Sequence, residues 1–143
     1  MTKGFTGTCL CRKVSLTIKG ETIGTNLCHC TNCQKAAGSV FYTGVRYPAE
    51  NVTYNDPDSV IKTHVDGTGE LASGIQRSFC GNCGSLIRIS SINYPQFVSV
   101  PFGIIDSDEK ADFKPTTEFF CDRRVDWVAA VEGSTKFATM PAV

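Results

Sequence analysis

Seven of the eight cysteines in this 143-residue chain stand in three tight clusters, and this spacing constrains the fold more than any other feature. Zinc takes four protein ligands in a closed structural site, but only three in a catalytic site that keeps one position open. Seven thiols therefore divide most simply into one closed site and one open site. The clusters are Cys9 with Cys11, Cys28 with Cys30 and Cys33, and Cys80 with Cys83.

The first and last clusters are about seventy residues apart, and each is a close pair of cysteines. Four sulfurs from two such distant turns, each about 2.3 Å from one zinc ion, would hold the two ends of a sheet together. The middle cluster supplies three thiols within six residues, and no fourth cysteine follows nearby. We therefore predict two zinc ions per chain: a structural ion on Cys9, Cys11, Cys80 and Cys83, and a catalytic ion on Cys28, Cys30 and Cys33.

Disulfides, a redox site and an iron–sulfur cluster are the alternative uses of these cysteines. Cys-x-Cys and Cys-x-x-Cys spacings favour chelation over long-range bridging, and a domain of this size needs no covalent cross-links. No βαβ unit of the thioredoxin type surrounds the Cys-x-x-Cys pair. The middle cluster matches neither common iron–sulfur series, so iron is kept as a minor alternative.

The charge balance excludes several classes of partner. Fourteen basic and fourteen acidic residues cancel, so the basic surface that a nucleic acid requires is missing. No stretch reaches the ~20 apolar residues of a membrane span. The first residues lack an apolar run of the secretory type, so we expect a cytoplasmic protein with reduced thiols. The length fits one zinc-binding domain over residues 1–143.

Alternating apolar residues predict a mostly β fold of several short antiparallel strands with at most one or two helical turns. One helix is expected over residues 31–37, with Thr31 as its N-cap and Gly38 as its end. Asp66-Gly67 is expected to form a hairpin turn. The predicted strands lie near residues 14–18, 40–45, 60–65, 76–79, 86–89, 97–100 and 116–121.

Four motifs together are similar to a known family. They are Gly7-Thr-Cys9-Leu-Cys11, Cys28-His-Cys30-x-x-Cys33, Phe79-Cys80-x-x-Cys83-Gly84 and the later Trp127, and they extend over nearly the whole chain. In order and spacing they resemble the glutathione-dependent formaldehyde-activating enzyme family, which includes the centromere protein V type.

This resemblance implies a β-tent zinc fold and a carbon–sulfur lyase that forms or cleaves S-hydroxymethylglutathione. It also implies that Cys28, Cys30 and Cys33 are the catalytic ligands, and that the other two cysteine pairs bind the structural zinc. The chain differs from the usual family pattern at Gln34, where arginine is common, and at Glu118, where histidine is common. Both positions are expected to affect how the carboxylates of a thiol substrate are held.

An open zinc position suggests a specific reaction. A thiol that enters as the fourth ligand loses its proton, and the resulting thiolate can attack formaldehyde. The expected partner is a small glutathione-like thiol or its adduct, and the alternative is a non-catalytic zinc module for a protein partner. Basic residues that could hold substrate carboxylates are Lys35, Arg77, Arg88, Arg123 and Arg124.

Four further side chains have both a structural and a functional interpretation. His29 stands between two predicted ligands, so it either shuttles protons, binds metal or points outward. His64 is expected to be structural. Cys121 is expected to be a small buried hydrophobe, and Trp127 a core residue that could also line the pocket.

Overall fold

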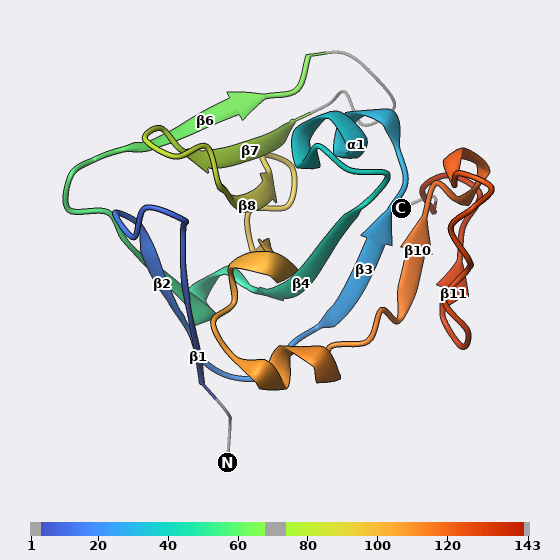
Figure 1. The fold of residues 1–143 in the computed structure, drawn as a ribbon, viewed down its shortest axis with the longest axis horizontal. Helices are drawn as coiled ribbons and strands as arrows, with labels where there is room; N and C mark the ends of the chain where they lie inside the picture. Colours follow the sequence, from blue (N-terminus) through green and yellow to red (C-terminus); the bar gives the residue numbers. More distant parts are fainter. Residues whose placement is uncertain (1–3, 68–73, 142–143) are drawn as a thin grey trace.

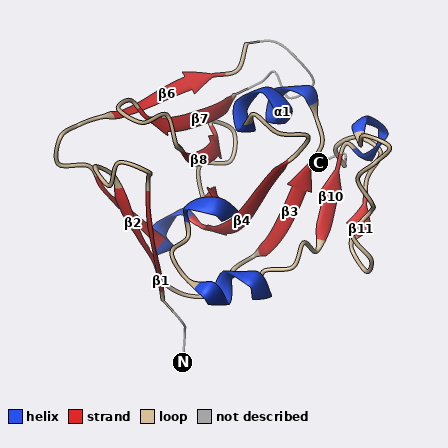
Figure 2. Cartoon of the chain, in the orientation of Figure 1, coloured by secondary structure: helices blue, strands red, loops and turns tan. Residues whose placement is uncertain are grey.

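The computed structural model describes residues 4–67 and 74–141, and it confirms the mostly β fold (Figure 2). The strands of these described residues form one sheet of three strands and one of eight. Among the described residues the longest helix has seven residues, so none of their helices could cross a membrane.

The smaller sheet has the order β1-β2-β5, and both of its pairings are antiparallel. It consists of β1 (Phe5–Thr8), β2 (Ser15–Ile18) and β5 (Val52–Asn55). In β2 the predicted alternation is present, because Leu16 and Ile18 are buried while Thr17 between them is exposed.

The larger sheet has the order β11-β10-β3-β4-β9-β8-β7-β6 (Figure 1). Its pairings are antiparallel except that β10 runs parallel to both β3 and β11, which differs from the predicted all-antiparallel arrangement. The strand β10 returns to the edge of β3 only after a long connection from β9, so no hairpin imposes an antiparallel direction. The strands are β3 (Gly24–Cys28), β4 (Tyr42–Pro48), β6 (Ile61–Val65), β7 (Ile75–Cys80), β8 (Leu86–Ser91), β9 (Phe97–Pro101), β10 (Thr117–Phe119) and β11 (Thr135–Lys136).

Residues 4–67 and 74–141 contain one α-helix, α1 (Thr31–Ala37), which follows β3 directly (Figure 1). Its N-cap is Cys30 rather than the predicted Thr31, because the Cys30 sulfur accepts a hydrogen bond from the backbone N–H of Cys33. Gly38 ends the helix as predicted, in a left-handed conformation with φ 61°. Four short 3-10 turns complete the helical content of the part of the chain that the structure describes: Ala49–Asn51, Phe102–Ile104, Asp108–Asp112 and Cys121–Arg123.

The strand ends before Asp66-Gly67 as predicted, and β6 and β7 form an antiparallel hairpin, but the two residues are not a tight turn, because the Asp66 N–H still donates to the Ile75 carbonyl at 2.9 Å. The strand β6 ends at Val65 and β7 begins only at Ile75, and the intervening residues 68–73 lie outside the described part. Asp66 is instead buried, and its carboxylate receives hydrogen bonds from the Arg77 guanidinium. Its side chain is therefore used in a tertiary contact.

The main apolar core lies between the two sheets. Leu16 and Ile18 of β2 pack there against Val45 and Tyr47 of β4, together with residues of β5 and β9. Two smaller clusters surround the cysteines, one around Cys28, Cys30 and Cys33 and one around Cys9 and Cys80. The cysteine clusters are therefore built into apolar packing at two separate places.

Three expectations about single residues can be compared with this packing. Trp127 is 76% exposed, so its prediction as a core residue is wrong; it follows the short turn at Cys121–Arg123 in the irregular segment before β11. Cys121 is half-buried, and its thiol contacts the Glu118 carbonyl oxygen at 3.6 Å. His64 is exposed on β6, and it lies 3.8 Å from the Asp66 carboxylate.

Candidate metal centres and substrate cavity

Cys9, Cys11, Cys80 and Cys83 come together as predicted, and all four sulfurs lie within 4.8 Å of one another. The Cys9 and Cys11 sulfurs are 3.6 Å apart, and those of Cys11 and Cys80 are 3.7 Å apart. Sulfurs at the corners of a tetrahedron, about 2.3 Å from a central zinc ion, lie about 3.8 Å apart. These four residues could therefore hold one metal ion, and the spacing fits zinc.

The local backbone explains how two distant turns present these sulfurs. Cys80 ends β7, and the N–H of Gly84 closes the turn by donating to the Cys80 carbonyl at 2.8 Å. Gly84 has φ 80°, which a residue with a side chain would adopt only with strain. The backbone N–H of Cys83 points at the Cys80 sulfur at 3.5 Å; this contact lowers the pKa of Cys80, but burial and the thiols of Cys83 and Cys11 raise it to about 11.

Cys28, Cys30 and Cys33 form the second cluster, and their sulfurs also lie within 4.8 Å of one another. Cys28 is the last residue of β3, Cys30 caps α1, and Cys33 lies in the first turn of that helix. All three are at least 96% buried. Within the described residues, no further cysteine, histidine or carboxylate completes the group. A group of three cysteines without a fourth protein ligand is the arrangement that we predicted for an open metal site.

The surroundings of the second cluster act unequally on its thiols: the pKa values of Cys28 and Cys33 are raised, whereas that of Cys30 is lowered. Hydrogen bonds from the thiols of Cys28 and Cys33 lower the pKa of Cys30 to about 3. The Arg77 guanidinium lies 3.8 and 3.9 Å from the Cys33 sulfur through its two terminal nitrogens. Asp66 orients Arg77 from the other side with a 2.9 Å ion pair, and both side chains are buried. A fixed positive charge therefore faces the sulfurs.

A cavity of about 620 Å³ opens onto this second cluster. Cys28 and Cys33 line it, whereas none of the four cysteines of the first cluster does. Along β4 the side chains alternate: Tyr42 and Arg46 face the cavity, while Val45 and Tyr47 face the main core. This cavity thus lies over the three-cysteine cluster, with Arg46 and Arg77 in its wall.

Gly44 makes this wall possible. A Cβ at this position would lie 2.7 Å from the Tyr42 hydroxyl and would collide with the Ser99 side chain on β9. The absence of a side chain lets the Tyr42 hydroxyl reach the Ser99 hydroxyl at 2.9 Å. Burial raises the pKa of Tyr42, although the bond to Ser99 acts in the opposite direction, so the phenol keeps its proton at neutral pH. Tyr42 is directly opposite Cys28 in the strand pairing.

Of the five basic residues predicted to hold substrate, only Arg77 lines the cavity. Arg88 lies over the Tyr54 ring at 4.8 Å, and Arg124 is bound to Glu118. Lys35 and Arg123 are exposed. The sequence analysis missed Arg46, which lines the cavity and stacks on Phe97 at 5.6 Å. The sequence did contain a signal for Arg46: in a strand, residues two apart lie on the same face, so Arg46 shares a face with Gly44 and Tyr42.

The two positions that differ from the usual family pattern are not in the cavity. Gln34 donates from its side chain to the His29 carbonyl oxygen at 2.8 Å, within the turn that enters α1. Glu118 is fully buried on β10 and lies 3.1 Å from the His29 ring. His29 is itself fully buried, so the outward orientation considered for it is wrong. Neither Gln34 nor Glu118 lines the 620 Å³ cavity.

Glu118 links the segment that carries Cys28, Cys30 and Cys33 to the C-terminal segment. One carboxylate oxygen contacts the His29 ring nitrogen Nε2 and accepts a hydrogen bond from the Arg124 guanidinium, at 3.1 Å each. The other accepts bonds from the Val131 N–H at 3.0 Å and the Ser134 hydroxyl at 2.9 Å. Burial alone would raise the pKa of Glu118, but the hydrogen bonds from these four groups lower it to about 2.

Replacing Glu118 by glutamine is therefore expected to lower the free energy of unfolding by about 3 kcal/mol at pH 7, because removing one partner of a buried ion pair leaves the others uncompensated. Urea denaturation of the metal-loaded protein measures this. The pKa of Glu118 in the folded protein lies below the ordinary 4.5, so its contribution to stability is present above that pH and is lost as the pH falls towards 2.

Asp58→Asn is the control, since it removes only the exposed Lys13–Asp58 pair and should change stability by less than about 1 kcal/mol. Equal losses for the two variants would contradict the linking role of Glu118.

Fold and site together define a mostly β protein with two cysteine clusters that could each hold a metal ion. The chain belongs to the glutathione-dependent formaldehyde-activating enzyme family, which it matches over residues 4–123. A crystal structure of a Rhodobacter sphaeroides protein has the same fold, with a TM-score of 0.58 and 17% identity, over 75% of this chain and 93% of that one. No match was found among curated proteins.

Proposed function

We propose that this protein is a zinc-dependent carbon–sulfur lyase that forms and cleaves the adduct of formaldehyde with a glutathione-like thiol. The family supports an enzyme acting on formaldehyde and glutathione. The observation that carries the finer proposal is the difference between the two cysteine clusters. Only the three-cysteine cluster faces the 620 Å³ cavity, so only there can an added sulfur complete a metal site.

Each cluster receives one zinc ion in this proposal. Zinc bound to Cys28, Cys30 and Cys33 would supply a coordination position at which an incoming thiol becomes a thiolate. In the forward reaction the thiol sulfur forms a bond to the formaldehyde carbon, and the thiol proton ends on the new hydroxyl group. The reaction needs no oxidant or further reactant. Cys9, Cys11, Cys80 and Cys83 would hold the structural ion.

The side chains of the cavity have distinct roles. Arg77 balances the negative charge of the sulfurs beside Cys33, and its ion pair with Asp66 fixes its position. Arg46 is not paired to a carboxylate by any contact among the described residues, so it is the better group for a substrate carboxylate. The protonated Tyr42 hydroxyl, opposite Cys28, is suitably placed to donate to the aldehyde oxygen.

The test is exchange spectroscopy with ¹³C-labelled formaldehyde and glutathione at equilibrium. Zinc-loaded protein should speed the exchange between formaldehyde hydrate and the hydroxymethyl adduct. Arg46→Gln should reduce kcat/KM for glutathione about tenfold, because one charged hydrogen bond to a carboxylate is lost. With 2-mercaptoethanol, a thiol without carboxylates, the same variant should match the unmodified protein.

The control is Cys121→Ser, which changes a thiol outside both clusters and should leave the exchange rate unchanged. Absence of any acceleration by zinc-loaded protein would reject the enzyme and favour a non-catalytic zinc module. All eight cysteines are free thiols, which supports the proposed cytoplasmic location, where thiols stay reduced.

A further inference from the structure

Asn26 of β3 is a buried polar side chain in the wall of the 620 Å³ cavity, and it has no part in the proposed lyase reaction. Only 9% of the residue is exposed. Its carbonyl oxygen Oδ1 is buried without a hydrogen-bond partner among the described residues, and none of them bonds to its Nδ2 either. Buried amide groups normally have partners, because an unpaired one costs free energy. The Asn26 amide is therefore available to a ligand of the cavity.

The strand pairing explains why no neighbour on β4 covers this amide. The residue opposite Asn26 on β4 is Gly44, which has no side chain. A Cβ at Gly44 would collide with the Ser99 side chain and crowd the Tyr42 hydroxyl, so a larger residue there would disturb the contact between these two groups. The sheet therefore keeps the position beside Asn26 free of a side chain.

Three functional groups follow one another along this face of the sheet. Cys28 and Asn26 are two residues apart on β3, so both side chains face the cavity about 7 Å apart along the strand. Arg46 of β4 also lines the cavity, and it is opposite Gly24, two residues further along β3. The wall thus presents a sulfur of the three-cysteine cluster, then an amide, then a guanidinium group.

This order matches the order of functional groups in a cysteinyl peptide. In such a thiol the sulfur is followed by a peptide group and then by the carboxylate of the next residue. The Asn26 side chain can pair with both halves of a peptide group, because it has one acceptor oxygen and an NH₂ donor. Its terminal torsion is broad and roughly two-fold, so a ligand can select the orientation in which both halves are paired.

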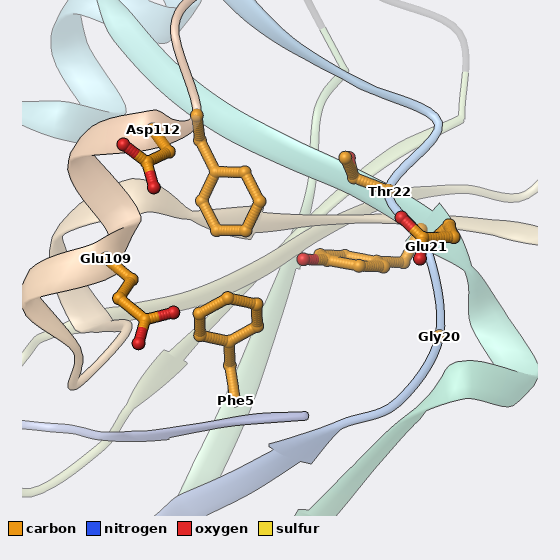
Figure 3. Close-up of a pocket in the computed structure, with 8 residues that line it drawn as sticks. Phe5, Gly20, Glu21, Thr22, Glu109 and Asp112 are labelled. Carbon is orange, nitrogen blue, oxygen red and sulfur yellow. The ribbon is translucent and has the colours of Figure 1, made fainter. Parts of the chain in front are cut away.

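The smaller cavity of the protein suits such a substrate less well. Figure 3 shows Phe5, Glu109 and Asp112 around it, and it shares no lining residue with the 620 Å³ cavity. Its volume is about 160 Å³, and the described residues that line it include no cysteine, arginine or lysine. It therefore offers a substrate carboxylate no cationic lining residue, whereas the larger cavity has Arg46 and Arg77.

We propose that Asn26 is a specificity-determining residue that binds the peptide group of a cysteinyl-peptide thiol. Its Oδ1 accepts the peptide N–H, and its Nδ2 donates to the peptide carbonyl oxygen. Arg46 holds the carboxylate on one side of this group, and the substrate sulfur lies towards Cys28 on the other. This role of Asn26 rests on the proposed function, and it narrows the substrate from any small thiol to one with a peptide group next to its thiol-bearing residue.

The test compares two thiols of equal length in the formaldehyde exchange assay with zinc-loaded protein. In 3-mercaptopropionylglycine a peptide group separates the thiol from the carboxylate, and in 6-mercaptohexanoate two methylene groups replace it. Asn26→Leu keeps the size of the side chain and removes its polar atoms. The ratio of kcat/KM for the peptide thiol to that for 6-mercaptohexanoate should fall at least about fivefold, the effect of one net hydrogen bond.

Binding is measured separately from turnover, by NMR titration of ¹⁵N-labelled, zinc-loaded protein. The side-chain NH₂ signals of Asn26 should shift and saturate with 3-mercaptopropionylglycine, and the Kd for this thiol should rise at least about fivefold in Asn26→Leu. The melting temperature should not fall, because no described residue loses a hydrogen-bond partner. Asn55→Leu is the control, since Asn55 is an exposed asparagine of β5 that lines neither of these two cavities, and it should change neither the ratio nor the Kd.

The two readouts separate this role from the lyase itself. Absence of exchange with either thiol would reject the lyase, while a selective loss of 3-mercaptopropionylglycine affinity in Asn26→Leu would still support the role of Asn26. Normal exchange with an unchanged ratio, or an unchanged Kd for the peptide thiol in Asn26→Leu, would overturn the role of Asn26 and leave the lyase standing.

Discussion

Replacing Cys80 by serine is expected to unfold the protein at 25 °C. Cys80 is fully buried, and its sulfur belongs to the cluster that joins the turn after β1 to the turn between β7 and β8. These turns belong to different sheets, so a metal ion bound there cross-links the two halves of the fold. Structural zinc contributes about 10–16 kcal/mol in small zinc domains, while whole domains are stable by only about 5–15 kcal/mol.

The measurement combines metal content, circular dichroism and thermal melting. The Cys80→Ser protein should lose the metal of the first cluster and should show no cooperative transition. Cys121→Ser is the matched control, because it makes the same chemical change at a half-buried cysteine outside both clusters. A Cys80→Ser variant that melts with the unmodified protein would show that the four-cysteine cluster does not stabilise the fold.

Replacing Cys30 by serine is expected to remove one metal ion and thiol-dependent turnover while the fold is retained. Its sulfur belongs to the three-cysteine cluster and also caps α1 by accepting the Cys33 N–H at 3.3 Å. Serine is itself a preferred N-cap, so the helix keeps its first hydrogen bond. Replacing a residue that only hydrogen-bonds to a metal ligand typically lowers metal affinity or activity about 10–100-fold. Replacing the ligand itself should therefore lower turnover by at least about a hundredfold.

The formaldehyde exchange assay and metal analysis test this second prediction. One zinc ion per chain should remain, and the melting temperature should stay within a few degrees of the unmodified value, in contrast to Cys80→Ser. If Cys30→Ser unfolds the protein as severely as Cys80→Ser, the division into a structural and a catalytic site is wrong. If it keeps both metal ions and full turnover, the three-cysteine cluster is not the site of the reaction.

The two cysteine clusters were predictable because the cysteines that form them are close in sequence within each motif. Cys28, Cys30 and Cys33 are brought together by one strand end and one helical turn, so their proximity hardly depends on the rest of the fold. The pairs Cys9–Cys11 and Cys80–Cys83 are local in the same way, and counting ligands indicated that the two pairs share an ion. The family motifs contain these same residues, which is why the resemblance and the spacing lead to the same two sites.

The side chains around the clusters were harder to predict, because several elements place them together. Arg46 faces the cavity only because β4 pairs with β3 and β9, and because Gly44 leaves room for the Tyr42–Ser99 contact. Aspartate is a residue type that is common in turns, but in this fold the Asp66 carboxylate is buried and orients Arg77. Which side chains meet in this way depends on how the strands pair, and a local sequence pattern does not specify that register.

The sequence by itself determined the mostly β class, the family and the two groups of cysteines that could hold metal ions, because alternation and ligand spacing are local properties. Only the tertiary structure decided that Glu118 is buried against His29, that Trp127 is exposed, and that one cysteine cluster faces a cavity. These features depend on contacts between residues far apart in the chain. Such contacts exist only once the sheets have packed.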